Sequence, residues 1–328
     1  MELLPEFFRA MCENAAIVPP HPNPDRRIQE AGQIYQGYDF DIVHVFRLAS
    51  LPFARPYFKQ PHGRARIHLD LDDIESKTYR RFASLLRHAG DEEAVESAEG
   101  LAKRSFMLET YAFRTVDRMY VCSEQDRQEL LGRCEIEIRV LRNAVRLPAV
   151  VYPPPVSPVF RFMFVGNLGY YPNEDAARYF CKQILPLIRE SAQTEFRVDF
   201  VGARAPQSLF ELSTANVHIV GAVEDVRPWY ESCHAVIVPI RTGGGTRIKI
   251  LEAFSYRRPV ITTSIGVEGI DAEPNRHMLE ADSPEAFALA CLQVMQDPDR
   301  ANALVQNAND LVRELYSSEA LKVNVASL

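Results

Sequence analysis

The stretch Phe160-Arg161-Phe162-Met163-Phe164-Val165, followed at once by Gly166-Asn167, decides the fold class of this chain. The run is short, rich in phenylalanine and valine, and ends at a glycine, which is typical of a strand buried on both faces of a parallel sheet. Similar runs recur towards the C-terminus, separated by stretches of helical length. This alternation predicts βαβ units and an α/β fold. Strands are predicted at 196–201, 217–220, 235–240 and 260–263, and helices at 175–190, 246–256 and 284–296.

The first half of the chain shows a similar but less complete pattern. Strands are predicted at 41–45, 66–71, 119–123 and 138–141, and a helix at 92–114 whose charges form a solvated face. Ligands of open α/β sheets bind at the carboxyl ends of the strands. We therefore expect functional residues just after the predicted strands.

The clearest break in the pattern is the segment from Pro148 to Pro158, which is rich in proline. Proline lacks a backbone N–H and has a fixed φ, so this segment favours an extended, stiff connector over a helix or a central strand. The segment predicts a domain boundary. We expect two Rossmann-like domains, at 1–150 and 159–328.

The composition narrows the function classes. Hydrophobic residues make up 47% and charged residues 25% of the 328 residues, so large cores can form. The formal net charge of -7 argues against nucleic-acid binding. The six cysteines form no close pairs, so we expect neither a zinc site nor a disulfide scaffold. With no signal peptide and no membrane-spanning run, the sequence predicts a soluble, cytoplasmic protein.

The most informative segment is Gly243-Gly244-Gly245-Thr246-Arg247-Ile248-Lys249, at the start of the predicted helix 246–256. Three glycines permit positive φ and let a bulky anion approach the backbone. Thr246 is the predicted N-cap, which directs free backbone N–H groups and the positive end of the helix dipole towards a ligand. Arg247 and Lys249 add two cations in the first turn, which is unfavourable unless an anion is bound.

A carboxylate, Glu252, follows Lys249 by three residues, so the two side chains are neighbours on one helix face. Glu252 can accept hydrogen bonds from ribose hydroxyls, while N–H groups and cations hold a diphosphate. The alternative is a glycine-rich surface loop with an ion pair between Lys249 and Glu252. Two cations and a carboxylate at this spacing favour a nucleotide site.

Taken in order, these segments resemble the C-terminal domain of the GT-B-fold retaining glycosyltransferases of family four. The resemblance covers residues 160 to 300 approximately. Within that family, the sequence is most similar to bacterial sugar transferases from exopolysaccharide clusters. These proteins carry a Gly-Gly-Gly-Thr-Arg loop. Besides the glycine-rich segment, the matching stretches are 164–168, 199–202, 220–226, 238–240, 258–263 and 266–269.

The resemblance implies two Rossmann-like domains and a nucleotide diphosphate sugar as donor. It implies transfer of a hexose, with retention, to a hydroxyl of a sugar or lipid-linked acceptor, and it implies no metal ion. By the same resemblance, Glu252 contacts the nucleotide ribose and Val223 lies against the base. Gly166 and Asn167 are expected in the donor site, together with the residues from Gly243 to Lys249.

Three positions depart from the family pattern. The first glutamate of the family's paired-glutamate motif falls at Gly244, which has no side chain to contact the sugar. The family's Arg and Lys after the first strand are absent, and Asn167 and Pro172 stand near their places. We therefore expect Arg247 and Lys249 to supply the charge that holds the diphosphate.

The first half resembles the acceptor domain of the family more loosely. Residues 117–124 and 140–145 match recurrent elements, but the glycine-rich loop after a first N-terminal strand is absent. The sequence therefore predicts an acceptor domain shortened at its start.

Candidate residues of the first half cluster after a predicted strand, at Asp70-Leu71-Asp72-Asp73. Carboxylates spaced as Asp70 and Asp72 suit Mg²⁺ or Mn²⁺, although the GT-B resemblance implies no metal. We expect Asp72 or Asp73 to position an acceptor hydroxyl at the inter-domain cleft. Capping of the strand end is the alternative. Weaker candidates for the reacting centre are His44, His62, His68 and Arg47.

A peripheral contact with a membrane is the least supported partner prediction. Phe7, Phe8 and Met11 have the spacing of an apolar helix face, but the segment lacks a basic face, and packing in a core is the alternative.

The sequence as a whole predicts a glycosyltransferase of polysaccharide or glycoconjugate synthesis, with Asp72, Asp73, Arg247 and Lys249 as catalytic candidates. The truncated first domain and Gly244 leave open a non-catalytic subunit that binds nucleotide sugars. A sugar-nucleotide epimerase, which shares the fold, is the other alternative.

Overall fold

The computed structural model describes residues 24–35, 37–58 and 63–327. Phe7, Phe8, Met11 and His62 lie outside these residues. The chain divides into two compact units, Met1–Leu141 and Arg142–Leu328, so the proline-rich segment 148–158 belongs to the second unit. The residues just after the division already pack on that unit, because Val145 N–H donates to the Tyr316 carbonyl at 2.8 Å.

The first unit contains a four-stranded parallel sheet. Its strands are β1 (Ile42–Phe46), β2 (Arg66–Asp70), β3 (Arg118–Val121) and β4 (Glu137–Val140), in the order β1-β2-β3-β4. Because the strands follow one another in one direction and such crossovers are right-handed, the connecting helices share one face of the sheet. These connections are η1 (Leu48–Tyr57), α3 (Glu75–Ala89) with α4 (Glu92–Thr115), and α5 (Glu124–Leu131).

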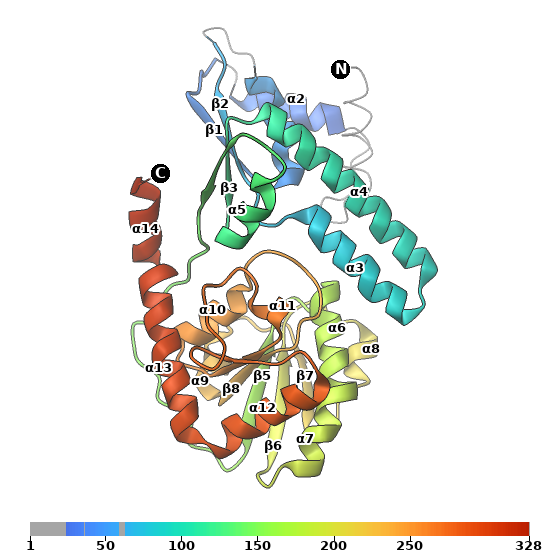
Figure 1. Cartoon of the computed structure of the whole chain (residues 1–328), viewed down its shortest axis with the longest axis vertical. Helices are drawn as coiled ribbons and strands as arrows, with labels where there is room; N and C mark the ends of the chain where they lie inside the picture. The colour runs from blue at the N-terminus through green and yellow to red at the C-terminus, as the bar shows by residue number, and fades with distance from the viewer. Residues whose placement is uncertain (1–23, 36, 59–62, 328) are drawn as a thin grey trace. The chain divides into compact units, whose positions relative to one another are not determined.

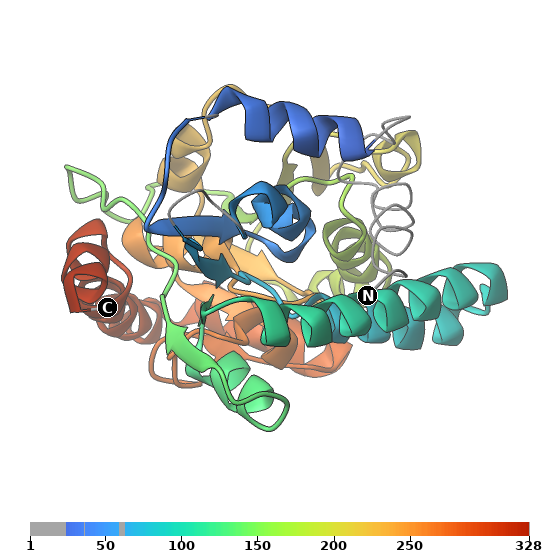
Figure 2. The same cartoon turned by 90° about the horizontal axis from the view of Figure 1, so that it is seen from above.

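A single apolar core lies between that sheet and its helices. Leu48 of η1, Leu108 of α4 and Leu130 of α5 are buried in it with Ile67 and Leu69 of β2. Helix α2 (Pro24–Ile34) packs against η1. Helices α3 and α4 lie side by side as a long hairpin (Figures 1 and 2).

The second unit contains a six-stranded sheet of order β10-β9-β8-β5-β6-β7, and every pair of neighbours is parallel. Its short runs of Val, Ile and Phe are buried on both faces, as a parallel sheet covered by two helical layers requires. The strands are β5 (Phe160–Val165), β6 (Phe196–Val201), β7 (Val217–Gly221), β8 (Ala235–Val238), β9 (Val260–Thr262) and β10 (Leu279–Glu280).

Two helical layers cover this sheet (Figure 1). One contains α6 (Tyr171–Tyr179), α7 (Leu185–Ser191) and α12 (Pro284–Gln296), which pack together through the π-helical turn η2 (Phe180–Ile184). The other contains α10 (Ile248–Ser255), which packs on α13 (Pro298–Leu315). The remaining helices are α8 (Gln207–Phe210), α9 (Arg227–Ser232), α11 (Ser264–Val267) and α14 (Ser318–Ser327).

The direction of the chain reverses beside β5. From β5 it runs outward through β6 to β7, and then returns to place β8 on the other side of β5. The loops that leave the carboxyl ends of β5 and β8 therefore diverge into opposite helical layers. This topological switch point is where ligands bind in open α/β sheets.

The predicted α/β fold with two parallel sheets flanked by helices is confirmed. The predicted helix 175–190 begins earlier, at Tyr171, and η2 widens it just before Pro186, whose missing N–H interrupts the regular bonding. Among the described helices, none has both the length and the apolar character that a bilayer crossing demands.

Candidate nucleotide site

The glycine-rich turn leaves the carboxyl end of β8 and enters α10. Gly243 has φ 121° and Gly245 has φ 66°, backbone conformations that residues other than glycine rarely adopt. The helix begins only at Ile248, with Arg247 as the N-cap and no capping bond from a side chain. The prediction that Thr246 caps the helix is therefore wrong, because the glycine conformations prolong the turn past it.

Arg247 organises this turn from within. Its side chain is almost buried, with 8% exposed, and its Nη1 donates to the carbonyl oxygens of Gly244 and Gly245. The guanidinium thus lies at the positive end of α10 and holds the glycine backbone in place. The Oγ1 atoms of Thr242 and Thr246 are buried in the same turn and have no hydrogen-bond partner among the described residues.

Lys249 reaches from α10 to the first strand-to-helix turn of the sheet. Its Nζ donates to Asn173 Oδ1 of α6 at 2.7 Å and lies 4.1 Å from the centroid of the Phe164 ring of β5. Burial, and then the charge of Arg247, lower the pKa of Lys249 to about 7, while Glu252 acts to raise it. The ammonium group is therefore placed at the switch point at a cost in solvation.

The Gly166 turn after β5 is built closely around this lysine. A Cβ on Gly166 would lie 2.7 Å from Lys249 Nζ and 2.9 Å from Asn173 Nδ2, so only glycine leaves room for both. Asn167 Oδ1 accepts from Gly169 N–H at 3.1 Å, and the Asn167 carbonyl accepts from Asn173 Nδ2 at 2.9 Å. The structure therefore brings together Gly166, Asn167 and Lys249, three of the predicted donor-site residues.

Glu252 does not form the ion pair with Lys249 that the sequence left as an alternative. Its Oε2 accepts a hydrogen bond from the buried Tyr230 hydroxyl of α9 at 2.8 Å. Burial raises the pKa of Glu252, and the Tyr230 bond and Lys249 oppose this rise. The Tyr230 ring stacks on Tyr256 at 4.8 Å between centroids, which fixes its hydroxyl in place.

A bidentate ion pair anchors the beginning of the glycine turn. Arg241, three residues after β8, contacts both carboxylate oxygens of Asp175 in α6 at 3.0 and 2.6 Å. The guanidinium also lies 4.3 Å from the centroid of the Tyr179 ring. The turn is thus tied to α6 at one end by Arg241 and, through Lys249 and Asn173, at the other.

Val223 follows β7, at the same carboxyl edge of the sheet, and packs partly buried on the core. The strand ends beside it are linked, because Gly166 N–H donates to the Val201 carbonyl at 3.0 Å and Gly202 N–H to the Gly221 carbonyl at 2.8 Å. Asn173, Arg241 and Tyr230 were not among the predicted site residues. A signal existed only for Arg241, which is a cation close after a predicted strand.

The first unit has its own cluster at the carboxyl edge of its sheet. Arg47, after β1, forms an ion pair with Asp72, after β2, at 2.8 Å. Both residues have positive φ, 66° and 54°, which is strained for residues other than glycine. Asp73 accepts from Thr78 Oγ1 of α3 at 3.0 Å through each carboxylate oxygen.

His44 of β1 and His68 of β2 are paired across neighbouring strands and lie on one face of the sheet. His44 Nε2 is 3.9 Å from Asp70 Oδ2, and the buried His68 is 3.4 Å from the Tyr120 hydroxyl. Burial is the main cause that lowers the pKa of His68 and raises that of Asp70. Within the described ranges, no group of three His, Cys, Asp or Glu side chains is placed to hold a metal ion.

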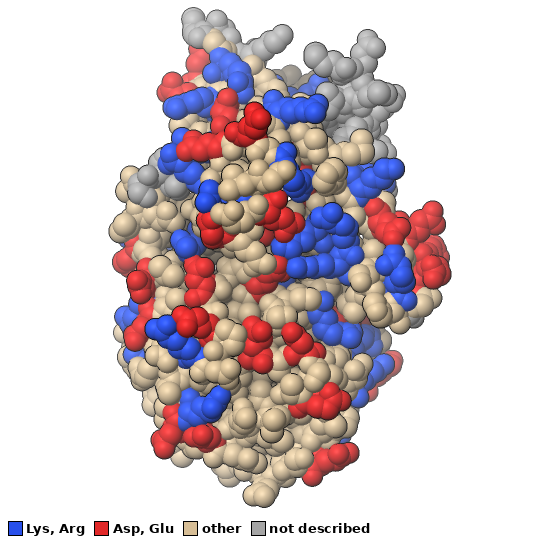
Figure 3. Space-filling view, in the orientation of Figure 1, with Lys and Arg blue, Asp and Glu red and all other residues tan. Residues whose placement is uncertain are grey.

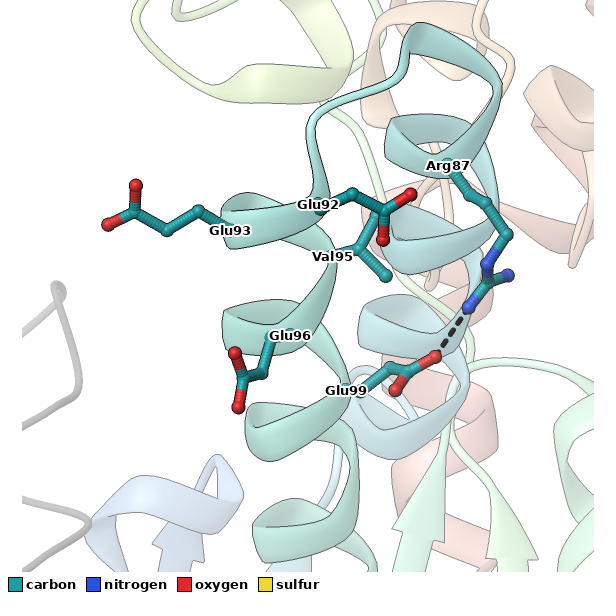
Figure 4. Close-up of a pocket in the computed structure, with 6 residues that line it drawn as sticks. All are labelled: Arg87, Glu92, Glu93, Val95, Glu96 and Glu99. Atoms are coloured by element: carbon teal, nitrogen blue, oxygen red, sulfur yellow. Dashed lines mark hydrogen bonds and ion pairs between the residues drawn. The ribbon is translucent and has the colours of Figure 1, made fainter.

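A shallow hollow at the tip of the α3–α4 hairpin does not suit a nucleotide. Figure 4 shows Glu92, Glu93, Glu96 and Glu99 around it, with Arg87 paired to Glu99. Phosphate groups are repelled by such exposed carboxylates. The face drawn in Figure 3 carries both acidic and basic side chains, with a group of basic side chains near its centre.

Comparison with known proteins identifies the domain that carries the glycine turn. Residues 159–297 match the family model of group 1 glycosyl transferases. This part of the second unit is thus similar to a group 1 glycosyltransferase domain, over less than half of the chain. The match includes every residue of the site described above, from Gly166 to Glu252.

The solved structures that this chain resembles share the GT-B fold. Sucrose-phosphate synthase from Thermosynechococcus elongatus has a TM-score of 0.70 at 16% identity, over 94% of this chain and 80% of that one. Staphylococcus aureus TarM, in complex with Fondaparinux, alpha-GlcNAc-glycerol and UDP, has a TM-score of 0.69 at 14% identity, over 92% and 58%. Anabaena HepE, in complex with UDP and glucose, has a TM-score of 0.66 at 14% identity, over 92% and 79%.

A curated relative of this chain comes from Klebsiella pneumoniae, an uncharacterized 44.6 kDa protein in the cps region. It is 20% identical over 166 residues, which are 48% of this chain and 42% of the relative. The chain thus matches less than half the length of that protein.

Proposed function

We propose that the chain transfers a hexose from a nucleotide diphosphate sugar to an acceptor hydroxyl, in polysaccharide or glycoconjugate synthesis in the cytoplasm. The observation that carries the proposal is the position of Lys249. Its ammonium group lies at the topological switch point, between the Gly166 turn and the Gly243–Gly245 turn, next to the start of α10. Backbone N–H groups, a helix N-terminus and a cation together suit a diphosphate.

Glu252 is placed to contact the ribose of the nucleotide. Its Oε2 already accepts from Tyr230, and within the described chain its Oε1 has no hydrogen-bond partner. A carboxylate oxygen held in this way can accept hydrogen bonds from the two ribose hydroxyls. The raised pKa of Glu252 reflects a buried carboxyl group, to which a ribose would restore polar contacts.

In the reaction, the bond between the sugar C1 and the diphosphate oxygen breaks, and the acceptor oxygen bonds to C1. The acceptor proton leaves with the diphosphate, which gains negative charge as the bond breaks. Lys249 and the amides of the glycine turn would stabilise that charge, so no metal ion is required. We expect retention at C1, in keeping with the family resemblance.

Two further observations support the proposal. TarM and HepE, which have the same fold, were both solved with UDP. The Oγ1 atoms of Thr242 and Thr246 are buried without described partners, and a phosphate would provide acceptors for them. The sugar itself must be held without a carboxylate at Gly244.

The test is a thermal-shift and calorimetric screen of UDP, GDP, ADP, CDP and TDP, each beside its nucleoside. We expect one diphosphate to raise the melting temperature and its nucleoside to do so much less, because a ligand of the native state stabilises it by mass action. Lys249→Met should lower the affinity for the diphosphate at least about tenfold, because one charge-assisted hydrogen bond is lost. Lys182→Met, at an exposed lysine of η2, is the matched control.

Glu252→Gln is the informative change at the ribose contact, because the amide still accepts from the buried Tyr230 hydroxyl. This change should lower the affinities for the diphosphate and for its nucleoside by the same factor, since both ligands contain the ribose. Glu190→Gln, at an exposed residue of α7, serves as its control. Binding of no diphosphate by the wild-type chain would overturn the proposal. If the chain binds a diphosphate but releases no nucleotide from any pair of donor and acceptor, its function would be nucleotide-sugar binding without transfer.

A further inference from the structure

The partner of Lys249 is chemically unusual for a buried ammonium group. Among the described residues, no carboxylate lies within ion-pair distance of Lys249 Nζ, and its hydrogen-bond acceptor is the neutral amide oxygen of Asn173. A buried lysine is ordinarily neutralised by an acid or loses its proton. Here the structure supplies a directed hydrogen bond without a compensating charge.

Asn173 is itself fixed on both sides. Its side chain is almost buried, with 7% of the residue exposed, and its Nδ2 donates to the Asn167 carbonyl at 2.9 Å. That carbonyl belongs to the Gly166 turn, where a Cβ would meet both the Asn173 amide and the lysine. The amide orientation is therefore determined by the carbonyl, and its oxygen must face Lys249.

We propose that Asn173 is the positioning residue for Lys249, which it holds over the Gly166 turn with its charge uncompensated, so that the diphosphate of the donor is its counter-ion. This inference rests on the function proposed above. It adds that affinity for the diphosphate is regulated by proton uptake at one lysine, and that a neutral acceptor at residue 173 sets the pH at which this happens.

The groups that face the lysine from each neighbouring element support this assignment. From its own helix and N-cap, Arg247 lowers the pKa of Lys249 and Glu252 raises it. From α6 comes the neutral Asn173, from β5 the Phe164 ring, and from α9 Tyr230, whose hydroxyl is bonded to Glu252. With a pKa of about 7, Lys249 is partly deprotonated at neutral pH and takes up a proton when an anion binds.

The experiment measures the calorimetric affinity of the diphosphate selected by the screen between about pH 6 and pH 9. The wild-type affinity should be constant below the pKa of Lys249 and then fall up to about tenfold per pH unit, because one proton is linked to binding. Titration in buffers of different ionisation enthalpy should show uptake of a proton. The matching nucleoside should show no such dependence.

Two changes at Asn173 move this profile in opposite directions. Asn173→Asp places a carboxylate beside the ammonium group, so the pKa of Lys249 rises. The affinity for the diphosphate should then no longer change with pH over this range, and at about pH 6 it should fall at least about tenfold. Asn173→Ala removes the acceptor, and the fall in affinity should begin at lower pH. A merely structural role would lower affinity by the same factor at every pH.

The outcomes separate this inference from the proposed function. Diphosphate binding with an unchanged pH profile in both folded variants would overturn the role of Asn173 and leave the function intact. Absence of diphosphate binding in the wild type would overturn both. Should either Asn173 variant fail to fold, Lys249→Arg tests the titrating group itself, because a guanidinium does not titrate in this range and the fall in affinity above about pH 7 should disappear.

Discussion

Gly202 approaches Gly166 so closely that a Cβ on Gly202 would lie 1.7 Å from the Gly166 carbonyl oxygen. The two glycines end the neighbouring strands β6 and β5, and the Gly166 turn that they shape surrounds Lys249. The obstacle to a side chain here is backbone, which cannot rotate away as the end of a flexible side chain can. Glycine at residue 202 is therefore a requirement of the site.

Gly202→Ala should destabilise the second unit by at least about 3 kcal/mol, since a backbone collision is a severe form of overpacking. Gly100→Ala is the matched control, because a Cβ there meets nothing within 4 Å and the residue lies inside α4. It should stabilise the chain by roughly 0.5–1 kcal/mol, the helix preference for alanine over glycine. Urea unfolding of both variants measures this, and an unaffected Gly202→Ala chain would contradict the geometry.

Lys249 is expected to reduce the stability of the chain in return for its function. Its pKa is about 7, well below the ordinary 10.5 of lysine, so the unfolded chain binds more protons between these values. The free energy of unfolding therefore rises with pH through this window. Below about pH 7 the buried ammonium group is charged and its destabilising effect is fully present. Lys249→Met should raise stability at about pH 6 by roughly 1–2 kcal/mol, the common gain from relieving a functional residue. Equal effects at about pH 6 and pH 10 would contradict this.

Glu75 is the corresponding acid of the first unit. Burial, and then the charges of Asp73 and Glu109, raise its pKa from 4.5 to about 7, while Ser105 Oγ, at 3.4 Å, lowers it. The folded chain thus binds the extra proton, so the contribution of Glu75 to stability is greatest below pH 4.5 and is lost as the pH rises through about 7. Glu75→Gln should stabilise the chain at about pH 8 by roughly 1–3 kcal/mol and change little near pH 4.

The control for that measurement is Glu93→Gln, at an exposed glutamate of α4 that should alter stability little at either pH. Thermal unfolding at the two pH values gives the comparison. A loss of stability in Glu75→Gln at about pH 8 would show instead that the carboxylate is satisfied in the folded chain.

The strands of the second unit were predictable because burial on both faces leaves continuous apolar runs. The bounds of β5 and β6 agree with the predicted 160–165 and 196–201, and α12 begins and ends as predicted. The sequence predicts neither α3 nor α13, since their many polar and charged residues hide the apolar stripe that packs on the core. The start of α10 was misplaced because three glycines can continue a turn that a capping pattern alone would end.

The composition of the site could be predicted from sequence, but the contacts could not. Spacing along a helix suggested that Lys249 and Glu252 face each other, yet each long side chain reaches a different element. Lys249 bonds to Asn173, 76 residues away, and Glu252 to Tyr230, 22 residues away. Such partners are set by how β8 returns beside β5, which no local pattern contains.

Asp72 is the residue of the first unit with the strongest geometric claim to a role in transfer. It combines a strained backbone with an exposed partner, since the Arg47 side chain is 53% exposed. Asn tolerates the left-handed conformation, so Asp72→Asn removes the charge and spares the backbone. We expect at least about tenfold slower transfer, because the carboxylate would no longer orient the acceptor hydroxyl, with unchanged affinity for the nucleoside diphosphate.

Asp73→Asn is the comparison for Asp72→Asn, because an amide oxygen still accepts from Thr78. If Asp73 only caps the strand end, its variant should keep nearly full transfer, and the difference between the two assigns the acceptor role to Asp72. The measurement is release of nucleoside diphosphate from donor with and without acceptor. Equal, undiminished rates in both variants would remove the two carboxylates from the reacting centre. A loss of nucleotide affinity in Asp72→Asn would instead make its effect one of donor binding.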